Sequence, residues 1–349
     1  MIVRSRESVV RVGPRREERE RAVESRTTDP LDPLDLKLLQ ALQLDGRAAY
    51  SRLAEVLGVS DQTVARRYRR LRTTAGLRVL GMTDESRLGR QSWVVRLRCT
   101  PDAAEQLAAA LARRPDTSYI GLFSGGTELM CAMKPRSSQE RDELLFDRLP
   151  RTPRVISVSA HCLLHSFYGG PLGWLNKLRA LDPEEEAALT PSPVGTSSDP
   201  VTLDAADEAL LAVLRRDGRT PLTELQKSTG QTESAVKRRL DRLRACGVLY
   251  FDVQNDYAPL GHTTDAMLWL TVAPSALDRV GRALAGHPEV GFAAAVTGQA
   301  NIVAAVLCRD TGALYTYLSE RIGGLDGVQA VETVLTLRQI KQLSYEPAR

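Results

Sequence analysis

The sequence predicts an α+β protein built from two tandem modules. Each module is predicted to be an all-α helix-turn-helix of the winged type followed by a ferredoxin-like βαββαβ domain. Three observations lead to this prediction: an internal repeat, helical periodicity at the start of each repeat, and alternating strand and helix patterns in the remainder. The chain has 349 residues, which at about 100–200 residues per domain is too long for one small domain.

The repeat relates two halves of the chain, here called copy one and copy two. The segment LDPLD at 31–35 returns as LDAAD at 203–207, and the triplet DGR at 45–47 returns at 217–219, an offset of 172 residues. Further along, Pro101 and Gly125 match Pro274 and Gly298 at an offset of 173. Because the period is so long, it indicates a fusion of whole domains and excludes a solenoid of short repeats.

The first part of each copy, residues 29–80 and 203–252, is helical by pattern. Leu34, Leu38 and Leu42 recur at helical spacing in copy one. We expect Gly46 to end this helix in the left-handed conformation. After a short second helix, Gly58 supplies a tight turn, and Ser60 is the predicted N-cap of a third helix whose Val64, Tyr68 and Leu71 face inward.

The second part, residues 81–178 and 253–345, alternates between strand and helix patterns. In copy one we expect strands at 93–99, 119–123, 129–133 and 155–163, with helices at 101–113 and 138–149. In copy two we expect strands at 267–272, 290–296, 302–307 and 328–337, with helices at 275–285 and 311–322. The order βαββαβ is that of the ferredoxin-like fold.

Two segments are predicted to lie outside the domains. Residues 1–28 carry eight arginines and five glutamates and are expected to form a disordered charged arm, either a solvating tail or a grip on DNA phosphates. Residues 179–202 are expected to be an exposed linker, since they are rich in Pro, Ser, Thr and Glu.

The charge of the chain is uneven. The formal net charge is only +4, but residues 61–78 hold six arginines and one aspartate. A basic stripe on the second helix of a helix-turn-helix is typical of DNA binding. Double-stranded DNA is therefore the predicted partner; the alternative is a structural helical triplet with solvated arginines.

In copy one, Arg66 and Arg69 are suited to bidentate contacts with guanine and Gln62 to contacts with adenine. Phosphate contacts are expected from the remaining basic residues of this region. The predicted DNA-contacting residues are Arg52, Ser60, Asp61, Gln62, Thr63, Arg66, Arg67, Arg69, Arg70 and Arg72.

In copy two the same surface is less basic. Gln226 replaces Ala54 where the helices cross, and Glu233 and Asp241 lower the net charge of residues 233–246 to +3. Either this copy contacts DNA with looser specificity or it is a scaffold for dimerisation. Its predicted contacts are Thr232, Glu233, Ser234, Lys237, Arg238, Arg239 and Arg242.

With these residues, both copies resemble the leucine-responsive/asparagine-regulator (Lrp/AsnC) family of bacterial transcription regulators. The resemblance rests on residues 31–71, residues 203–225 and the βαββαβ parts that follow, and so covers nearly the whole chain outside the arm and the linker. It implies a DNA-binding domain joined to a domain that binds a small effector, often an amino acid, and forms homo-oligomers. A regulator of this kind is expected to be cytoplasmic and nucleoid-associated.

The resemblance also implies an effector loop, T-G-x-x-D, between the second and third strands. The matching residues are Ser124, Gly125, Gly126, Thr127 and Glu128 in copy one and Thr297, Gly298, Gln299, Ala300 and Asn301 in copy two. The aspartate is replaced in both, which argues against an ordinary amino acid as the effector. The alternative is a plain hairpin in which the glycine serves the turn.

No enzyme, metal or cofactor signature stands out. The five cysteines are far apart, and His161 and His165 flank Cys162 at the end of a predicted strand, so we expect no zinc site and no cofactor. No apolar run is long enough to span a membrane. Two alternatives remain: sirohaem decarboxylases, which are similar to this family, and a ligand-binding or interaction module that does not bind DNA.

The duplication predicts an asymmetric DNA site. Palindromic sites mirror two-fold protein symmetry, and the two fused copies differ in their basic residues. We therefore expect one strong half-site, read by Arg66 and Arg69, and one degenerate half-site.

Overall fold

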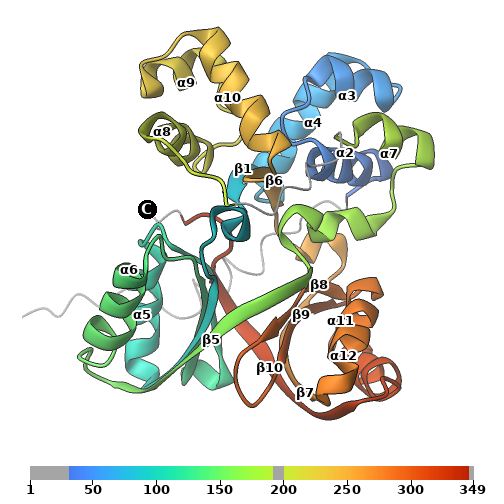
Figure 1. The fold of residues 1–349 in the computed structure, drawn as a ribbon. Coiled ribbons are helices and arrows are strands. Elements are labelled where there is room, and N and C mark those ends of the chain that lie inside the picture. The colour runs from blue at the N-terminus through green and yellow to red at the C-terminus, as the bar shows by residue number, and fades with distance from the viewer. Residues whose placement is uncertain (1–30, 192–199, 346–349) are drawn as a thin grey trace, which may run out of the picture.

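The computed structural model describes residues 31–191 and 200–345. The predicted arm at 1–28 lies outside these residues. Figure 1 shows two groups of helices side by side above a β-barrel, with a short two-stranded sheet between the groups. No helix in the described part of the chain combines the length and the hydropathy needed to cross a membrane.

Each group of helices begins with three helices of one copy. In copy one they are α2 (Pro33–Leu44), α3 (Tyr50–Val56) and α4 (Asp61–Thr74); in copy two they are α8 (Ala205–Leu214), α9 (Leu222–Thr229) and α10 (Glu233–Ala245). Both triplets contribute to one apolar cluster, which includes Leu39, Leu53, Leu71, Leu211 and Leu243. The two helical domains therefore share a core.

The strands that follow the helices pair with each other. β1 (Arg78–Thr83) runs antiparallel to β6 (Leu249–Gln254), from Arg78 opposite Gln254 to Thr83 opposite Leu249. The two modules therefore share their wing: β1 and β6 form one two-stranded sheet with one strand from each copy. A ladder between segments so far apart in sequence leaves no local pattern in either segment.

The remaining strands form one closed eight-stranded barrel in the order β10-β3-β4-β2-β5-β8-β9-β7. Copy one supplies β2 (Trp93–Cys99), β3 (Thr117–Phe123), β4 (Glu128–Met133) and β5 (Val155–Tyr168). Copy two supplies β7 (Thr264–Val272), β8 (Val290–Val296), β9 (Ile302–Cys308) and β10 (Val328–Lys341).

Helices cover the outside of the barrel. Copy one contributes α5 (Pro101–Ala112) and α6 (Ser138–Asp142), which continues as η3 (Glu143–Arg148). Copy two contributes α11 (Leu277–Gly286) and α12 (Thr311–Thr316), which continues as η8 (Tyr317–Ile322). Short helical turns occur at η1 (Glu85–Leu88), η2 (Ser124–Gly126), η6 (Ala258–Leu260) and η7 (Pro274–Ala276). Each half therefore follows the predicted order βαββαβ.

The strands of the two halves do not form separate sheets but join in one barrel. β5 pairs first with β2 and then, from Leu163 to Tyr168, with β8 of the other copy. β10 likewise pairs with β7 and then, from Thr336 to Lys341, with β3. Both strands run several residues past their predicted ends at 163 and 337, because these extensions close the barrel. Closure removes the exposed strand edges that each sheet would have alone.

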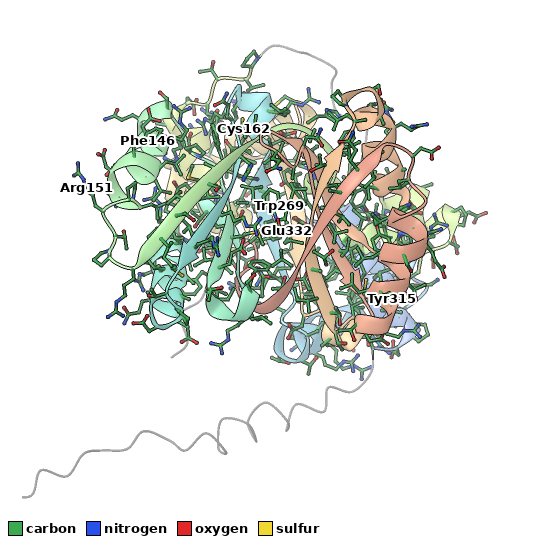
Figure 2. All side chains as sticks on the ribbon, turned by 90° about the horizontal axis from the view of Figure 1, so that it is seen from below. Phe146, Arg151, Cys162, Trp269, Tyr315 and Glu332 are labelled. Carbon is green, nitrogen blue, oxygen red and sulfur yellow. The ribbon has the colours of Figure 1, made fainter. Side chains whose placement is uncertain are left out.

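The interior of the barrel joins the two copies. Val94, Phe123 and Met130 of copy one pack against Trp269 and Val303 of copy two. The Arg96 guanidinium lies 5.5 Å from the Trp269 ring and pairs with Glu128 of its own copy and Glu332 of the other. Trp269 and Glu332 lie near the centre of the view in Figure 2.

The segment 179–202, predicted to be an exposed linker, contains a helix in its first part. Residues 183–189 form the helix α7 (Pro183–Leu189), capped by Asp182, with Leu189 buried. The Lys37 ammonium lies 2.6 Å from a carboxylate oxygen of Glu185, which fixes α7 against α2. Before it, η4 (Gly170–Leu172) and η5 (Trp174–Leu178) bury Trp174 and Leu175. The Pro- and Glu-rich composition that predicted a linker also matches a helix start, with Asp182 as the N-cap and Pro183 in the first turn.

The helical domain of each copy lies over the barrel half of the other. Figure 1 shows α8, α9 and α10 above the half that carries α5 and α6, and α2 to α4 above the half that carries α11 and α12. Contacts agree with this arrangement: Arg215, at the end of α8, donates to the carbonyl of Pro115 at 3.4 Å. The indole of Trp174 donates to the carbonyl of Pro288 at 3.1 Å.

Candidate nucleic-acid interface

The helix predicted to read DNA, α4, is built as expected. Gly58 has a φ of 65°, which gives the tight turn between α3 and α4. The Ser60 hydroxyl accepts a hydrogen bond from the Thr63 amide at 3.2 Å and so caps the helix. Val64, Tyr68 and Leu71 are buried. The predicted N-cap and inward face are confirmed.

The opposite face of α4 is exposed and basic. Asp61, Gln62, Arg66, Arg69 and Arg72 are all exposed. Among the described residues, Arg66 and Arg72 have no ion-pair or hydrogen-bond partner for their side chains, and Arg69 donates only to the Ala65 carbonyl of its own helix. Three guanidinium groups therefore face solvent on one helix.

Arg67 and Arg70, expected to contact phosphates, point elsewhere. One Arg67 amino group lies 3.0 Å from Asp35 and 2.5 Å from Asp32, and Arg70 pairs with the other oxygen of Asp35. Asp35 is completely buried. The Asp32 partnership raises the pKa of Arg67 above its usual range. These two arginines neutralise a buried carboxylate and connect α4 to the start of α2.

Copy two repeats this cluster. Arg239 lies 2.9 Å from Asp207 and 2.7 Å from Asp204, and Arg242 lies 2.5 Å from Asp207. Asp207 is also buried. The role of these aspartates was not predicted, although both occur in the repeated LDxxD segment and a buried carboxylate requires a charged partner.

The exposed face of α10 in copy two carries fewer free cations. Thr232 caps this helix, and Glu233, Ser234, Lys237, Arg238 and Asp241 are exposed. No side-chain partner occurs among the described residues for Lys237 or Arg238. Glu233 accepts a hydrogen bond from Gln226 at 3.3 Å. Two acidic groups thus accompany two free cations on this face.

Arg52, also expected at the phosphates, is held on the protein. Its guanidinium lies 2.8 Å from Glu55 and donates to the carbonyl of Ala188 on α7 at 3.1 Å. Arg52 therefore bridges α3 and α7. Ala188 lies in the segment that was predicted to be a linker, so this contact was not expected from the sequence.

The two helical domains are held together by a reciprocal contact of their DGR triplets. Arg47 donates to the carbonyls of Gly218 and Thr220 at 2.6 and 3.0 Å, and Arg219 donates to those of Gly46 and Ala48 at 2.7 and 2.9 Å. This exchange is the pattern expected of a two-fold interface. It fixes the helical domains that carry α4 and α10 against each other.

The glycine of the triplet serves this contact. Gly46 lacks the left-handed conformation predicted for it. A Cβ at Gly46 would lie 2.7 Å from Phe251 of the other copy, and one at Gly218 would lie 3.0 Å from the backbone of Val79 and Leu80 of the other copy. Glycine is needed here for close approach between the copies.

The effector loops expected from the resemblance are occupied by internal contacts. In copy one, the turn Ser124–Gly126 has positive φ at Gly125 and Gly126, as a hairpin turn requires, and Thr127 donates to the Ser124 carbonyl at 2.7 Å. Glu128 is buried and pairs with Arg96, and Ser124 donates to it at 3.1 Å. This carboxylate is already neutralised.

In copy two, Asn301 bonds to the backbone of β7 through both ends of its amide: it donates to the Val272 carbonyl at 2.8 Å and accepts from the Val272 amide at 2.9 Å.

The rest of this loop contacts the other copy and the barrel. Thr297 accepts from the Cys162 amide at 2.9 Å, and His161 contacts the Thr297 carbonyl at 2.7 Å. Gln299 accepts from Thr271 through its backbone, and Ala300 packs with the barrel interior. Gly298 has a φ of 125° beside His161. This loop connects the copies.

Metal-type clusters are not found in the described residues, where no three His, Cys, Asp or Glu side chains converge. His165 packs against Phe167, and the five cysteines are free thiols.

Two family models of DNA-binding domains match the helical parts. The AsnC-type helix-turn-helix domain matches residues 31–72, and the winged helix-turn-helix DNA-binding domain matches residues 203–250. The Lrp/AsnC ligand binding domain matches residues 265–345. The class defined by the fold and the exposed basic helix is thus a helix-turn-helix protein joined to a ligand-binding domain.

Curated relatives narrow this class. An uncharacterized HTH-type transcriptional regulator of Pyrococcus abyssi is 31% identical over 146 residues, which cover 42% of this chain and 92% of that protein. The HTH-type transcriptional regulator FL11 of Pyrococcus horikoshii is 29% identical over 150 residues, covering 43% of this chain and 99% of that protein. The chain belongs to the Lrp/AsnC family. These relatives are archaeal, so the restriction to bacteria is not supported.

One solved structure resembles the chain over nearly its whole length. The siroheme decarboxylase NirDL superposes with a TM-score of 0.61 and 17% identity, covering 90% of this chain and 94% of that one. At this identity the likeness concerns the fold alone.

Proposed function

We propose that the protein is a sequence-specific DNA-binding transcription regulator that responds to a small effector. The observation that carries this proposal is the exposed face of α4, where Arg66, Arg69 and Arg72 have no carboxylate partner among the described residues. Other arginines of the same helix are neutralised by Asp35, so exposure separates the two sets. The names of the relatives, HTH-type transcriptional regulators, point the same way.

In this function, Arg66, Arg69 and Gln62 read base edges in the major groove. Arg72, one turn further along the helix, neutralises a phosphate and fixes the position of the helix. The amino end of α4, with Ser60, Asp61 and Thr63, lies nearest the groove floor. Arg52, Arg67 and Arg70 support this helix from behind through their carboxylate partners.

Copy two supplies the weaker of the two DNA-binding domains, here called the weaker DNA reader. Lys237 and Arg238 contact phosphates, Thr232 and Ser234 lie at the start of the helix, and Glu233 and Asp241 repel the backbone. Arg239 and Arg242 stay with Asp207. One strong and one degenerate half-site follow for a single chain.

The proposed architecture has the boundaries stated above: helix-turn-helix domains at 29–80 and 203–252, and ferredoxin-like domains at 81–178 and 253–345. In each half the second, third, first and fourth strands lie side by side, as in ferredoxin-like sheets. Since the barrel uses its edges within one chain, association into homo-oligomers would use its outer surface. A DNA-bound regulator would be nucleoid-associated.

The test is selection of bound duplexes from a random library by the full-length protein, followed by anisotropy titrations on the selected site. We expect Arg66→Ala and Arg69→Ala to weaken binding by roughly five- to 150-fold and to relax base preference. The matched control is Arg282→Ala, an exposed arginine on α11 at the barrel. Absence of any selected sequence, or equal effects of all three substitutions, would refute the proposal.

The shared fold of a siroheme decarboxylase supplies a second arm to this test. Sirohaem is added to the same preparation and its absorption spectrum is recorded. A saturable shift of the Soret band, together with loss of a carboxyl group from sirohaem as carbon dioxide, would establish the enzyme. Binding of neither DNA nor sirohaem would leave an interaction module.

A further inference from the structure

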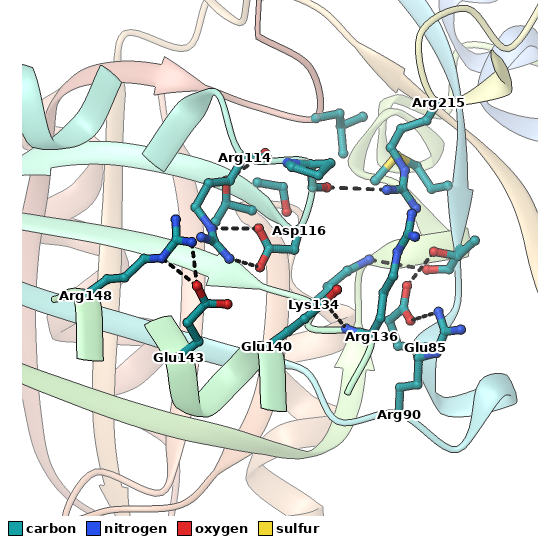
Figure 3. Close-up of a pocket in the computed structure, with 16 residues that line it drawn as sticks. Glu85, Arg90, Arg114, Asp116, Lys134, Arg136, Glu140, Glu143, Arg148 and Arg215 are labelled. Carbon is teal, nitrogen blue, oxygen red and sulfur yellow. Dashed lines mark hydrogen bonds and ion pairs between the residues drawn. The ribbon is translucent and has the colours of Figure 1, made fainter. Parts of the chain in front are cut away.

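A cavity of about 350 Å³ lies between the helical domain of copy two and the barrel half of copy one. Its walls come from the β1–η1 segment, the turn before β3, the end of β4, the α6–η3 helix and Arg215 after α8 (Figure 3). It lies apart from the effector loops described above, none of whose residues line it.

The cavity is rich in cations, most of which are paired. Arg114 lies 2.7 Å from Asp116, Arg148 lies 2.5 Å from Glu143, and Arg90 lies 3.5 Å from Glu85. Figure 3 shows these pairs around the rim. Arg136 reaches Glu208 of α8 only at 3.8 Å.

Two cations of the lining lack any ion-pair partner among the described residues. The Lys134 ammonium donates to the Thr83 carbonyl at 3.3 Å, and Arg215 donates to the Pro115 carbonyl at 3.4 Å, both long bonds. Burial lowers the pKa of Lys134 and of Arg215, the Glu85 carboxylate of the same lining offsets part of this effect for both, and the charge of Arg215 lowers the pKa of Lys134 further. An anion between them would remove this unfavourable burial of positive charge.

A third group in the lining is also unsatisfied. The Ser118 hydroxyl is buried, with the residue 5% exposed, and has no hydrogen-bond partner. An orphaned buried hydroxyl costs about 1–3 kcal/mol unless a ligand or water satisfies it. Ser118 lies on β3 and pairs with Ala132 of β4, and Lys134 is the residue directly after β4.

The repeat provides an internal comparison. By the same offsets, Lys134 corresponds to Leu307, Ser118 to Gly291 and Arg215 to Gln43. At this second junction Leu307 belongs to the apolar cluster of the helical domains, and a Cβ on Gly291 would lie 3.7 Å from Leu307 and 3.8 Å from Trp174. At this junction the apolar Leu307 stands where Lys134 would be, Gln43 donates to Asp252 at 3.1 Å, and the cation Lys177 donates to the His287 and Val290 carbonyls at 2.5 and 2.7 Å. The fold therefore does not need a cation at the positions of Lys134 and Arg215.

We propose that this cavity binds a small multivalent oxyanion, a phosphate or a polycarboxylate metabolite, through Lys134, Arg215 and Ser118. Such an anion bridges β4 of copy one and the end of α8 of copy two. It thereby fixes the weaker DNA reader relative to the barrel. The bridging role rests on the proposed function; the binding site itself does not.

Binding is tested without DNA, on the full-length protein at constant ionic strength. Inorganic phosphate and citrate are titrated separately by calorimetry, so that the two arms separate phosphate from carboxylate ligands. We expect saturable binding of at least one probe, weakened at least tenfold by Lys134→Leu and by Arg215→Gln and about threefold by Ser118→Ala. The first two variants introduce the residues that the other half of the molecule already accommodates.

Arg282→Gln, at an exposed surface pair, is the matched control and should leave binding unchanged. No saturable binding of either probe, or affinities unchanged in Lys134→Leu and Ser118→Ala, would overturn the site. DNA affinity is then measured with and without the bound probe. A shift of threefold or more that Arg215→Gln abolishes supports the bridge, and an equal affinity in both conditions overturns the bridge alone. Complete absence of DNA binding would refute the proposed function while leaving the binding site standing.

Discussion

Arg66 and Arg67 are neighbours on α4, yet their replacement by alanine should affect different properties: DNA affinity for Arg66 and stability for Arg67. Arg67 bonds to the buried Asp35 at 3.0 Å and to the half-exposed Asp32 at 2.5 Å. A hydrogen bond to a charged group stabilises by about 1.5–3 kcal/mol, and an exposed partner adds little. Because Arg70 still neutralises Asp35, we expect Arg67→Ala to cost about 2 kcal/mol of unfolding free energy.

Removing both partners should cost more. The double substitution Arg67→Ala and Arg70→Ala leaves Asp35 buried and unpaired, a situation that typically costs about 3–5 kcal/mol. Arg66→Ala removes an exposed side chain with no partner and should change stability by less than about 0.5 kcal/mol. The same change should weaken DNA binding by about 1–3 kcal/mol, roughly five- to 150-fold.

The assay combines urea unfolding, followed by far-ultraviolet circular dichroism, with anisotropy titrations on the selected duplex at a temperature where all variants are folded. Arg67→Ala should retain DNA affinity within a few-fold once folded. If Arg67→Ala leaves stability unchanged but abolishes DNA binding, the assignment of the two arginines is reversed. If Arg66→Ala destabilises the fold by about 2 kcal/mol, its exposed position is wrong.

Three further predictions concern the frame and the asymmetry. Burial raises the pKa of Asp252 to about 6, so the free energy of unfolding should fall as the pH rises from about 4 through 6. Asp252→Asn should remove this pH dependence and raise the free energy of unfolding by about 2–3 kcal/mol at pH 8, as measured by urea unfolding at about pH 4 and at pH 8. Arg47→Ala and Arg219→Ala should each destabilise the helical domains by about 2–4 kcal/mol, since each removes two bonds from a cation to carbonyls of the other copy; thermal unfolding unchanged in both would exclude the reciprocal contact. Footprints should lose protection over the whole site in Arg66→Ala but over only one half in Arg238→Ala, and identical footprints would rule out unequal half-sites.

Local patterns were enough to predict most of the helices and barrel strands, α4 among them. The leucine spacing of α2, the Gly58 turn and the Ser60 cap depend on residues within a few positions of each other. The repeat likewise predicted two copies of each domain. Contacts between copies leave no such signal, so the β1–β6 ladder and the extensions of β5 and β10 were not predicted.

The exposed site was only partly predictable for a related reason. A helical count places Arg67 three residues after Val64 and four before Leu71, at the edge of the buried face. That position requires a carboxylate, and the LDxxD segment repeated at 31–35 and 203–207 contained it. The net charge of the stripe does not distinguish paired from free arginines. Arg67 and Arg70 are paired with Asp35, so fewer arginines are available to DNA than the charge indicated.

Comparison of the two copies separates the residues that hold the molecule together from those that make it asymmetric. The DGR contact and the Asp35–Arg67 cluster recur at Arg219 and Asp207 with nearly the same distances. These shared residues are enough to build a pseudo-symmetric frame within one chain. The differences fall on surfaces that could meet another molecule. The free arginines of α4 give way to a mixed face on α10, and the Lys134 cavity gives way to packing around Leu307. An obligate homodimer must change both copies of a residue at once, whereas this fused chain can alter one reader or one junction alone. Divergence on the exposed helix faces and at one junction is what such freedom produces when the two halves take different tasks on a common frame.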